Sequence, residues 1–238
     1  MQQRTRRLLS VFAALFLFWN WVAASGHSDS SAIRFIQNNG QWEPQVLFAA
    51  DIPMGRVFLE KDRLTYAFCD VSNLHEQMFH NPPGKAVDST IDCHAFSVKF
   101  VGLPSAETIL GEKSVPEYHN YFHGADPKKW ASEVPLFKQV RYHNLYPGID
   151  FVIYTHGLGL KYDFVVQPGA NAGQVRLAYE GLEELGIDAG QLKMVTSINE
   201  IREDRPVAFQ NDQALPCNFS LEGNELGFYF PEGYDGKS

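Results

Sequence analysis

The sequence predicts an all-β fold: an antiparallel β-sandwich, or two packed sub-sheets, with few or no helices apart from a signal peptide. Short runs of aromatic and β-branched residues alternate with Gly, Pro, Asn and Asp, which is typical of strands and turns. These runs recur about every 8–12 residues, the spacing found in sandwich and barrel proteins. Aromatic residues make up 13% of the chain, as a β core would use.

The first expected strands form two pairs. Residues 34–36 and 46–50 flank an Asn-Asn-Gly turn signal at residues 38–40. Residues 56–60 and 64–69 are expected to form a hairpin around a Lys-Asp-Arg turn, because both runs are rich in aromatic and β-branched residues.

A polar segment, residues 70–92, follows, and its Pro-Pro-Gly sequence excludes a continuous element. Residues 94–101 then alternate strictly, which predicts a strand with two different sides. One side carries Phe96, Val98 and Phe100, and the other carries Ala95, Ser97 and Lys99. Residues 107–111 form a further expected strand within the segment 102–116, which marks a seam between two sub-sheets.

The second half of the chain continues the same pattern. Residues 118–122 and 134–142 flank a Gly-Ala-Asp-Pro turn, and residues 149–155 pair naturally with 160–166 across a glycine-containing turn. The remaining expected strands are residues 175–179, 182–187, 191–196, 201–206, 207–210, 215–221 and 225–230.

The N-terminus predicts export. Three arginines precede an apolar run at residues 8–24, and small residues follow it, as in a cleavable secretory signal peptide spanning residues 1–25. An uncleaved anchor is the alternative, although the run is at the short limit for crossing a bilayer. Residues 26–32 form an expected disordered leader and residues 33–238 the β module. We therefore expect a secreted or cell-surface protein without a membrane span in its mature chain.

The net charge of the chain limits the classes of partner that we expect. The formal net charge is −8 at pH 7, which argues against nucleic acid and anionic lipid and suits cations. An extracellular glycan or a surface protein remains as the expected partner, and the composition favours no particular oligomeric state. No cofactor is expected, with Ca²⁺ as the alternative.

Three cysteines follow the signal peptide. A bridge between Cys69 and Cys93 would close the base of the polar segment between two strands. An odd count leaves a third thiol, Cys217, free or paired with another chain. The alternative is that all three cysteines are small buried hydrophobic residues.

Two acidic residues form the candidate metal site. Asp150 and Asp163 lie on the facing strands of the hairpin at residues 149–166. Paired carboxylates can bind Ca²⁺ or perform acid–base chemistry. The alternative is that both face solvent, with Asp150 accepting hydrogen bonds from turn amides.

Histidines around the polar segment do not form a zinc-protease motif. His75 and His80 are five residues apart, whereas that motif places its two histidines four apart on one helical face. A looser cluster with Asp92, Cys93 and His94 could hold a metal. The alternative is a solvated polar loop.

Aromatic residues supply the candidate ligand-binding site. Trp42, Trp130, Tyr118 and Tyr121 could form a platform whose ring faces stack on sugars; the alternative is core packing with satisfied polar edges. A Ser-His-Asp order and a Gly-x-Ser-x-Gly motif are both absent, so no catalytic residue is expected.

Five motifs resemble one family when taken together in order. They lie at residues 35–51, 56–66, 118–130, 144–154 and 160–170. The sequence is similar to the N-terminal domain of unknown function of secreted Bacteroidota proteins. Such proteins carry SBBP (β-propeller) repeats and gliding-motility-associated C-terminal sorting domains. The resemblance implies cell-surface location and no established enzymatic activity. Relatives continue past the position of Ser238, so the domain's last strand would lie beyond it and leave an exposed sheet edge.

These observations favour a non-catalytic structural or binding module of a secreted or cell-surface protein. A carbohydrate-binding module is the first alternative, and a secreted hydrolase with an unrecognised site is the second.

Overall fold

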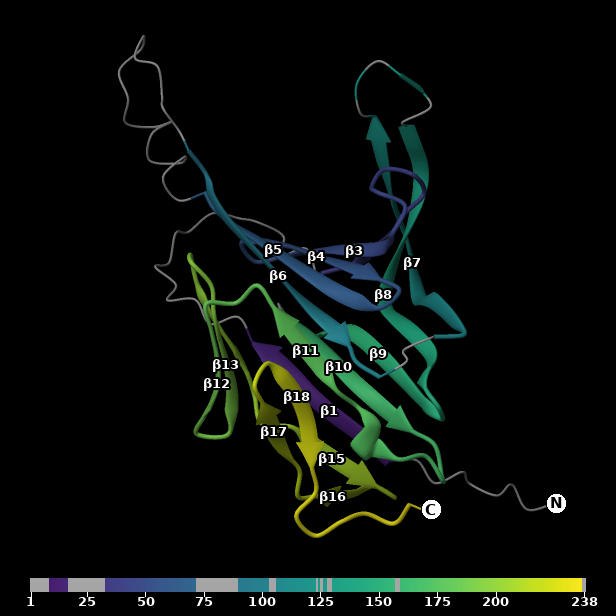
Figure 1. The fold of residues 1–238 in the computed structure, drawn as a ribbon. Coiled ribbons are helices and arrows are strands. Elements are labelled where there is room, and N and C mark those ends of the chain that lie inside the picture. The colour runs from purple at the N-terminus through teal and green to yellow at the C-terminus, as the bar shows by residue number, and fades with distance from the viewer. Residues whose placement is uncertain are drawn as a thin grey trace, which may run out of the picture.

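The computed structural model is an antiparallel all-β structure, as the sequence predicts (Figure 1). It describes residues 9–16, 33–71, 90–102, 106–122, 124, 126–127, 130–156 and 159–236. The expected leader at 26–32 lies outside these residues. The strands are β1 Leu9–Phe16, β2 Phe35–Gln37, β3 Val46–Ile52, β4 Gly55–Glu60, β5 Arg63–Asp70, β6 Asp92–Phe100, β7 Thr108–Phe122, β8 Trp130–Tyr146, β9 Ile149–His156, β10 Gly159–Val166, β11 Leu177–Glu180, β12 Glu184–Asp188, β13 Gln191–Val195, β14 Glu200–Glu203, β15 Val207–Gln210, β16 Gln213–Leu215, β17 Asn218–Glu222 and β18 Glu225–Tyr229.

Two layers of strands account for the architecture. In one layer, β2, β3, β4, β5 and β6 pair in sequence order, and β11, β18 and β17 extend the layer beyond β6. In the other, β7, β8, β9 and β10 pair in order, and β1 follows β10. The short strand β2 also pairs with β8, which joins the layers at one side.

Aromatic side chains fill the space between the layers. Phe100 of β6 contacts Tyr142 of β8 and Phe151 of β9, with ring centroids 5.6 and 5.0 Å apart. Phe164 of β10 contacts Phe228 of β18 at 5.7 Å. None of these strand pairs is hydrogen-bonded in the sheet, so the contacts cross between layers as in a sandwich.

The buried polar ends of the core tyrosines are satisfied. The Tyr142 hydroxyl donates to the carbonyl of Glu60 at 2.8 Å, and the Tyr146 hydroxyl donates to the carbonyl of Arg176 at 2.8 Å. These bonds tie β8 to the opposite layer. They also remove the cost of burying a hydroxyl without a partner.

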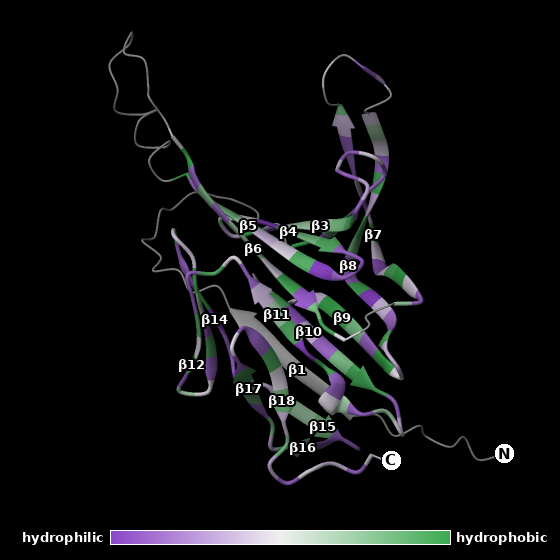
Figure 2. Cartoon of the chain, in the orientation of Figure 1, coloured by the Kyte–Doolittle hydropathy of each residue, from purple (hydrophilic) through white to green (hydrophobic). Residues whose placement is uncertain are grey.

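Alternation along the strands was predictable and is confirmed at β6. Phe96, Val98 and Phe100 are buried, and Lys99 on the other side is bonded to Glu180 at the surface. Figure 2 shows hydrophobic and hydrophilic residues alternating along several described strands, and the burial of β10 alternates in the same way. The sheet therefore has one face in the core and one toward solvent.

The segment 102–116, the expected seam, lies where the chain passes from β6 of one layer to β7 of the other. Two expected strands, 107–111 and 118–122, are parts of the single long strand β7, which pairs with β8 along most of its length. Register shifts interrupt this pairing, and Lys113 and Glu133 adopt positive φ angles of 55° and 53°. Such bulges bend and twist a strand, which allows one chain segment to leave the body of the sandwich.

Residues 9–16, within the apolar N-terminal run, form β1, which lies between β10 on one side and β14 and β15 on the other (Figure 1). Through this pairing the backbone of β1 joins β10 to β14 and β15. The cleavage of residues 1–25 stays a prediction. Among the described residues, no helical segment has the length and hydropathy of a membrane span.

Candidate functional site

The hairpin of β7 and β8 projects from the sandwich, and its far end carries exposed aromatic side chains (Figure 1). Tyr118, Phe122 and Trp130 are 55%, 63% and 44% exposed, respectively. We call these three exposed residues of the hairpin the tip cluster; Tyr118, opposite Pro135, lies nearer the sandwich than the pair of Phe122 and Trp130. Large exposed apolar side chains gathered on one element are a common mark of an interaction surface.

The tip cluster has a defined internal geometry. Phe122 and Trp130 are paired in register, and their ring centroids are 5.4 Å apart at an interplanar angle of 86°. The Trp130 indole N–H donates to the carbonyl of Gly124 at 3.1 Å, which fixes the indole across the end of the hairpin. These two rings are perpendicular, so they present an edge and a face instead of the flat platform that a sugar ring would favour.

The other two predicted ligand-binding residues, Trp42 and Tyr121, pack together against the side of the hairpin. Trp42 and Tyr121 contact each other edge to face, with ring centroids 5.7 Å apart. Both pack on a small hydrophobic cluster formed by Ile36, Ala131, Val134 and Leu136. The Arg56 guanidinium lies 5.5 Å from the Trp42 ring centroid. The structure thus separates the four predicted residues into an exposed pair and a packed pair.

Trp42 also borders an open hollow of about 550 Å³ beside the β2–β3 loop. The Asn38 side chain organises this loop: its amide donates to the carbonyls of Glu43 and Val46 at 3.0 and 2.7 Å. Its carbonyl oxygen accepts the backbone N–H of Gly40 at 3.0 Å. Gln37, Pro44 and Ile109 contribute to the lining of the hollow. The loop is therefore held in one conformation next to the hairpin base.

Phe122 was missed by sequence reasoning. The signal was present, because Phe122 and Trp130 lie on the two sides of the expected turn. Residues that flank a hairpin turn on both strands face each other across the pair.

The two predicted metal ligands have separate partners. Asp150 binds the Arg141 guanidinium at 3.2 Å and accepts the backbone N–H of Asn144 at 2.9 Å. Asp163 accepts a hydrogen bond from the Tyr154 hydroxyl at 3.1 Å. Their register partners are Val165 and Val152, so they are diagonal neighbours and not an opposed pair. Arg141 supplies at Asp150 the positive charge that a cation would otherwise bring.

Burial raises the pKa of the Asp163 carboxyl to about 7, although the hydrogen bond from Tyr154 acts in the opposite direction. A group with this pKa is largely protonated at mildly acidic pH, which weakens it as a calcium ligand there. In the described part of the chain, no three His, Cys, Asp or Glu side chains gather in a geometry suited to a metal. The calcium site stays a prediction.

The histidine cluster is only partly within the described residues, because His75 and His80 lie outside them. The His94 ring contacts the Ser197 hydroxyl at 3.0 Å and the Gly181 carbonyl at 2.6 Å. These contacts connect β6 to the loops before β12 and after β13. Within the described residues, His94 therefore has a structural role.

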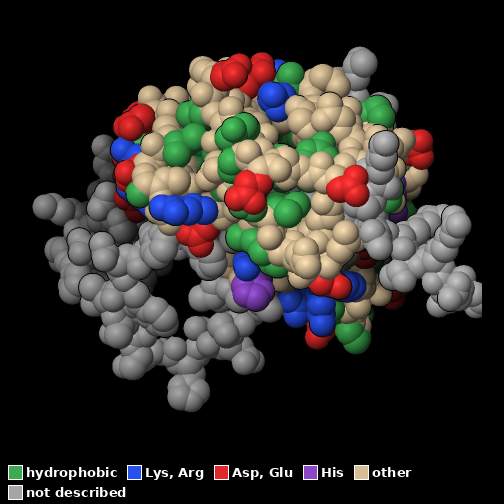
Figure 3. All heavy atoms as spheres, turned by 90° about the horizontal axis from the view of Figure 1, so that it is seen from below, with side chains coloured by type: hydrophobic (Ala, Val, Ile, Leu, Met, Phe, Trp, Pro, Cys, Tyr) green, Lys and Arg blue, Asp and Glu red, His purple; other side chains and the backbone are tan. Residues whose placement is uncertain are grey.

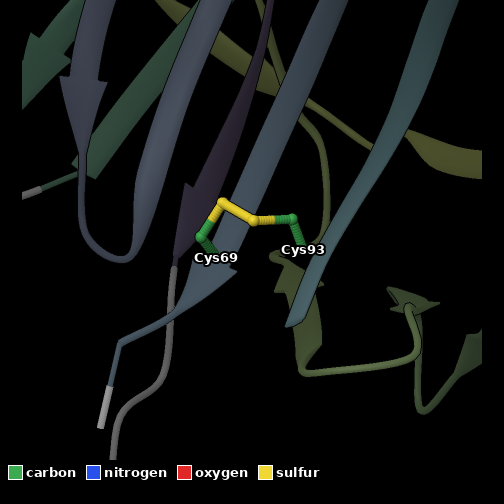
Figure 4. The surroundings of a disulfide bond; sticks show 2 residues. All are labelled: Cys69 and Cys93. Atoms are coloured by element: carbon green, nitrogen blue, oxygen red, sulfur yellow. A yellow bond between two sulfur atoms is a disulfide. The ribbon is translucent and has the colours of Figure 1, made fainter. Parts of the chain in front are cut away.

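Cys69 and Cys93 face each other across β5 and β6 and form a disulfide with an S–S distance of 2.07 Å (Figure 4). The bridge closes the polar segment, whose residues 72–89 lie outside the described part of the chain. Cys217 is a buried free thiol, and burial raises its pKa to about 12. Cys217 is therefore protonated and unreactive at physiological pH.

A buried carboxyl that the sequence did not reveal lies in the core. Glu203 of β14 is only 1% exposed and accepts a hydrogen bond from the Tyr162 hydroxyl of β10. Burial raises the pKa of Glu203 from its ordinary value of 4.5 to about 7, against the effect of that hydrogen bond. A perturbed carboxyl can mark a catalytic site. Glu203 does not reach solvent, however, so it does not meet the need of a hydrolase for an acid that contacts substrate.

We expect Glu203 to lower stability as the pH rises from about 4.5 to about 7. Across this window the folded protein retains a proton that the unfolded chain has lost, at about 1.4 kcal/mol per pH unit. A Glu203→Gln variant should lack this contribution, so its stability relative to wild type should increase across the window. Urea titrations at several pH values measure the difference. Glu222→Gln, an exposed carboxyl on β17, is the control, and parallel curves for Glu203→Gln and wild type would contradict the expectation.

Charged side chains do not form a single-sign surface on the face opposite the tip of the hairpin. Figure 3 shows acidic and basic side chains interspersed with hydrophobic ones there. Ion pairs join the strands of the β12–β14 meander at the surface: Lys193 of β13 pairs with Glu184 of β12, and Arg202 of β14 pairs with Asp188 of β12. This face therefore gives no electrostatic reason to expect a nucleic-acid partner.

Comparison with known proteins gives one match. A family model described as a domain of unknown function, DUF7948, matches residues 35–238. The match includes the strands of both layers from β2 onward, the projecting hairpin and the disulfide. No curated protein and no solved structure matches the chain.

Proposed function

The chain belongs to the DUF7948 family, whose description assigns no activity, and we propose that it is an exported, non-catalytic binding module of a secreted or cell-surface protein. The tip cluster is the observation that carries this proposal. It places three large aromatic side chains in solvent on an element that projects from a well-packed sandwich. The partner we infer is another surface protein.

The chemistry of the tip cluster favours a protein partner. Aromatic residues are enriched in the centres of protein–protein interfaces, because they bury a large area with few rotatable bonds. The perpendicular rings of Phe122 and Trp130 form a wedge that can enter a pocket. The bond from Trp130 to Gly124 orders the wedge before binding, which lowers the entropic cost of association.

Export is supported by the sequence and by the chemistry of the disulfide. The arginines and the apolar run at the N-terminus match a signal peptide. The bridge between Cys69 and Cys93 is typical of an oxidising compartment. The resemblance to the N-terminal domain of secreted Bacteroidota proteins supports the cell surface as the location.

Photo-crosslinking in exporting cells tests the binding proposal. A benzophenone side chain at Phe122 should form a discrete adduct with one partner protein. The same group at Tyr229, 58% exposed on β18, is the matched control and should not. We expect Tyr118→Ser combined with Trp130→Ser to weaken the adduct about tenfold or more, as a loss of about 1.4 kcal/mol or more would. Equal adducts at Phe122 and Tyr229 would contradict the proposal.

A carbohydrate-binding module is the second candidate, because the tip cluster also exposes ring faces. A glycan array separates the two functions. Saturable glycan binding that is lost in Trp130→Ser would replace the protein partner by a sugar. Sensitivity of that binding to EDTA would assign Asp150 or Asp163 to a calcium ion.

A further inference from the structure

The hollow beside the β2–β3 loop lies at the side of the sandwich where β2 joins the two layers. Phe48 of β3 lines it from one layer, and Ile109 of β7 lines it from the other. Both side chains belong to the main hydrophobic core or pack against it, so the hollow has apolar walls. Its volume of about 550 Å³ lies within the range of about 300–1,000 Å³ that small-molecule sites usually have.

A β-bulge in β3 brings consecutive residues to this hollow. The register with β4 shifts between Val46 and Phe48, so Leu47 is the extra residue of the bulge. A regular strand alternates its side chains between two faces, whereas Val46, Leu47 and Phe48 all line the hollow. Bulges re-aim side chains and are common beside functional sites. The shape of the hollow therefore depends on an irregular part of the sheet.

The loop that borders the hollow is cross-linked by its own side chains. Besides the bonds of Asn38 described above, the Asn38 side-chain oxygen accepts the backbone N–H of Trp42 at 3.2 Å. The Gln41 side-chain amide donates to the carbonyl of Gln37 at 2.6 Å, and its oxygen accepts the backbone N–H of Asn39 at 2.7 Å. A loop that is ordered in advance lowers the entropic cost of binding a ligand.

Two polar groups at the hollow have no hydrogen-bond partner among the described residues. They are the side-chain amide of Gln37 and the indole N–H of Trp42, and both residues are partly exposed. Gln37 is directly opposed to Phe48 in the register of β2 and β3, so the two side chains share one face of the sheet. The amide can donate and accept hydrogen bonds, and the indole can donate one.

None of the described residues that line the hollow carries a charge. The guanidinium of Arg56 lies on the Trp42 ring, but Asp51 neutralises it at 2.6 Å. A phosphate, a carboxylate or an ammonium group would therefore lose its hydration here without gaining a counter-charge. The lining favours an uncharged ligand that has both apolar and hydrogen-bonding groups.

We propose that this hollow binds a neutral pyranose sugar. A pyranose ring carries C–H groups on its faces and hydroxyl groups around its rim. The C–H groups contact the apolar walls at Trp42 and Ile109, and the Gln37 amide exchanges hydrogen bonds with neighbouring hydroxyls as donor and acceptor. A purely apolar ligand would leave the free amide and the indole N–H unpaired. The site is separate from the tip cluster and does not depend on the partner proposed there.

A nuclear magnetic resonance titration of the full chain tests the proposal. The probes are methyl β-glucoside, methyl β-galactoside and methyl α-mannoside, and methyl β-glucuronide is the charged match of the first. We expect at least one neutral glycoside to shift the Gly40 backbone and Trp42 indole signals saturably. The dissociation constant should be in about the millimolar range, as a ligand of this size gives at an open site. The glucuronide should bind about tenfold or more weakly than the glucoside.

Gln37→Leu and Gln45→Leu form a matched pair of variants. Gln45 is exposed on the same loop but does not line the hollow. We expect Gln37→Leu to weaken binding of the glycoside about tenfold, as the loss of one or two hydrogen bonds would, and Gln45→Leu to leave it unchanged. Equal binding by the two variants would overturn the proposal. The glucoside and glucuronide comparison needs no variant, so it tests the site even if Gln37→Leu misfolds.

The same titration separates this site from the tip cluster. Trp130→Ser should retain the shifts at Gly40 and Trp42. Shifts confined to Phe122 and Trp130 would overturn the proposal and assign the sugar to the tip cluster instead. The absence of saturable shifts with every neutral glycoside, or equal affinity for the glucuronide, would overturn it as well. Photo-crosslinking at Phe122 reports only on the tip cluster, so the two proposals fail through different measurements.

Discussion

Replacing Phe151 by alanine is expected to lower the free energy of unfolding by about 3–5 kcal/mol, the usual cost of truncating a buried aromatic side chain. Phe151 is 1% exposed. Its ring lies within 5.0–5.6 Å of Phe100, Tyr142, Tyr162 and Phe164, centroid to centroid. It therefore joins β6 of one layer to β8 and β10 of the other. The loss combines the transfer energy of the ring with the cavity that remains.

Phe122→Ala is the matched control for this experiment. The same substitution removes the same ring at a position that is 63% exposed, so we expect a change within about 0.5 kcal/mol. Urea unfolding followed by tryptophan fluorescence and by far-ultraviolet circular dichroism measures both variants. Equal losses for the two variants would mean that Phe122 is packed against the fold, and the tip cluster would then have no free ring to offer a partner.

Removing the disulfide is expected to lower the free energy of unfolding by about 3 kcal/mol. The bridge joins residues 24 apart in sequence, and closing a loop of this size restricts the unfolded chain by about that amount in the chain-entropy description. Cys69 and Cys93 are directly opposed on β5 and β6, whose backbone pairing remains in the variant. A Cys69→Ser, Cys93→Ser double variant should therefore fold and be less stable.

A reductant supplies the control for the disulfide variant. It should lower the stability of the wild type to that of the double variant and leave the double variant unchanged. Cys217 does not interfere, because it is buried and protonated. A wild type that is insensitive to reductant would contradict the expectation. It would also remove the support that the bridge gives to an oxidising location.

The strands of the sandwich could be predicted because their signal is local. Alternation at residues 94–100 identifies the buried side of β6 without any knowledge of its neighbours. The hairpin of β9 and β10 follows from two β-rich runs and a short turn. The residue type at every second position shows which face of a strand is buried, so one sequence is enough to predict that face.

The candidate site was only partly predictable. Sequence selected four aromatic residues, but it could not tell that Trp42 and Tyr121 pack together while Tyr118 and Trp130 stay exposed. Tyr121 precedes Phe122 directly, so the two side chains point to opposite faces of the hairpin, and Trp42 covers only the face of Tyr121. Glu203 was missed for the same reason. It lies on the same side of β14 as the buried Ile201, but its own burial depends on strands that are distant in sequence.

The sequence by itself determined the all-β class, most strand positions, the inward faces and the apolar character of the N-terminal run, since each depends on residues close together in the chain. Only the tertiary structure decided which aromatic rings are exposed, which carboxyl is buried and which strands border residues 9–16. Those properties depend on contacts between residues that are distant in sequence. Such contacts are fixed by the packing of two layers, and no local pattern records them.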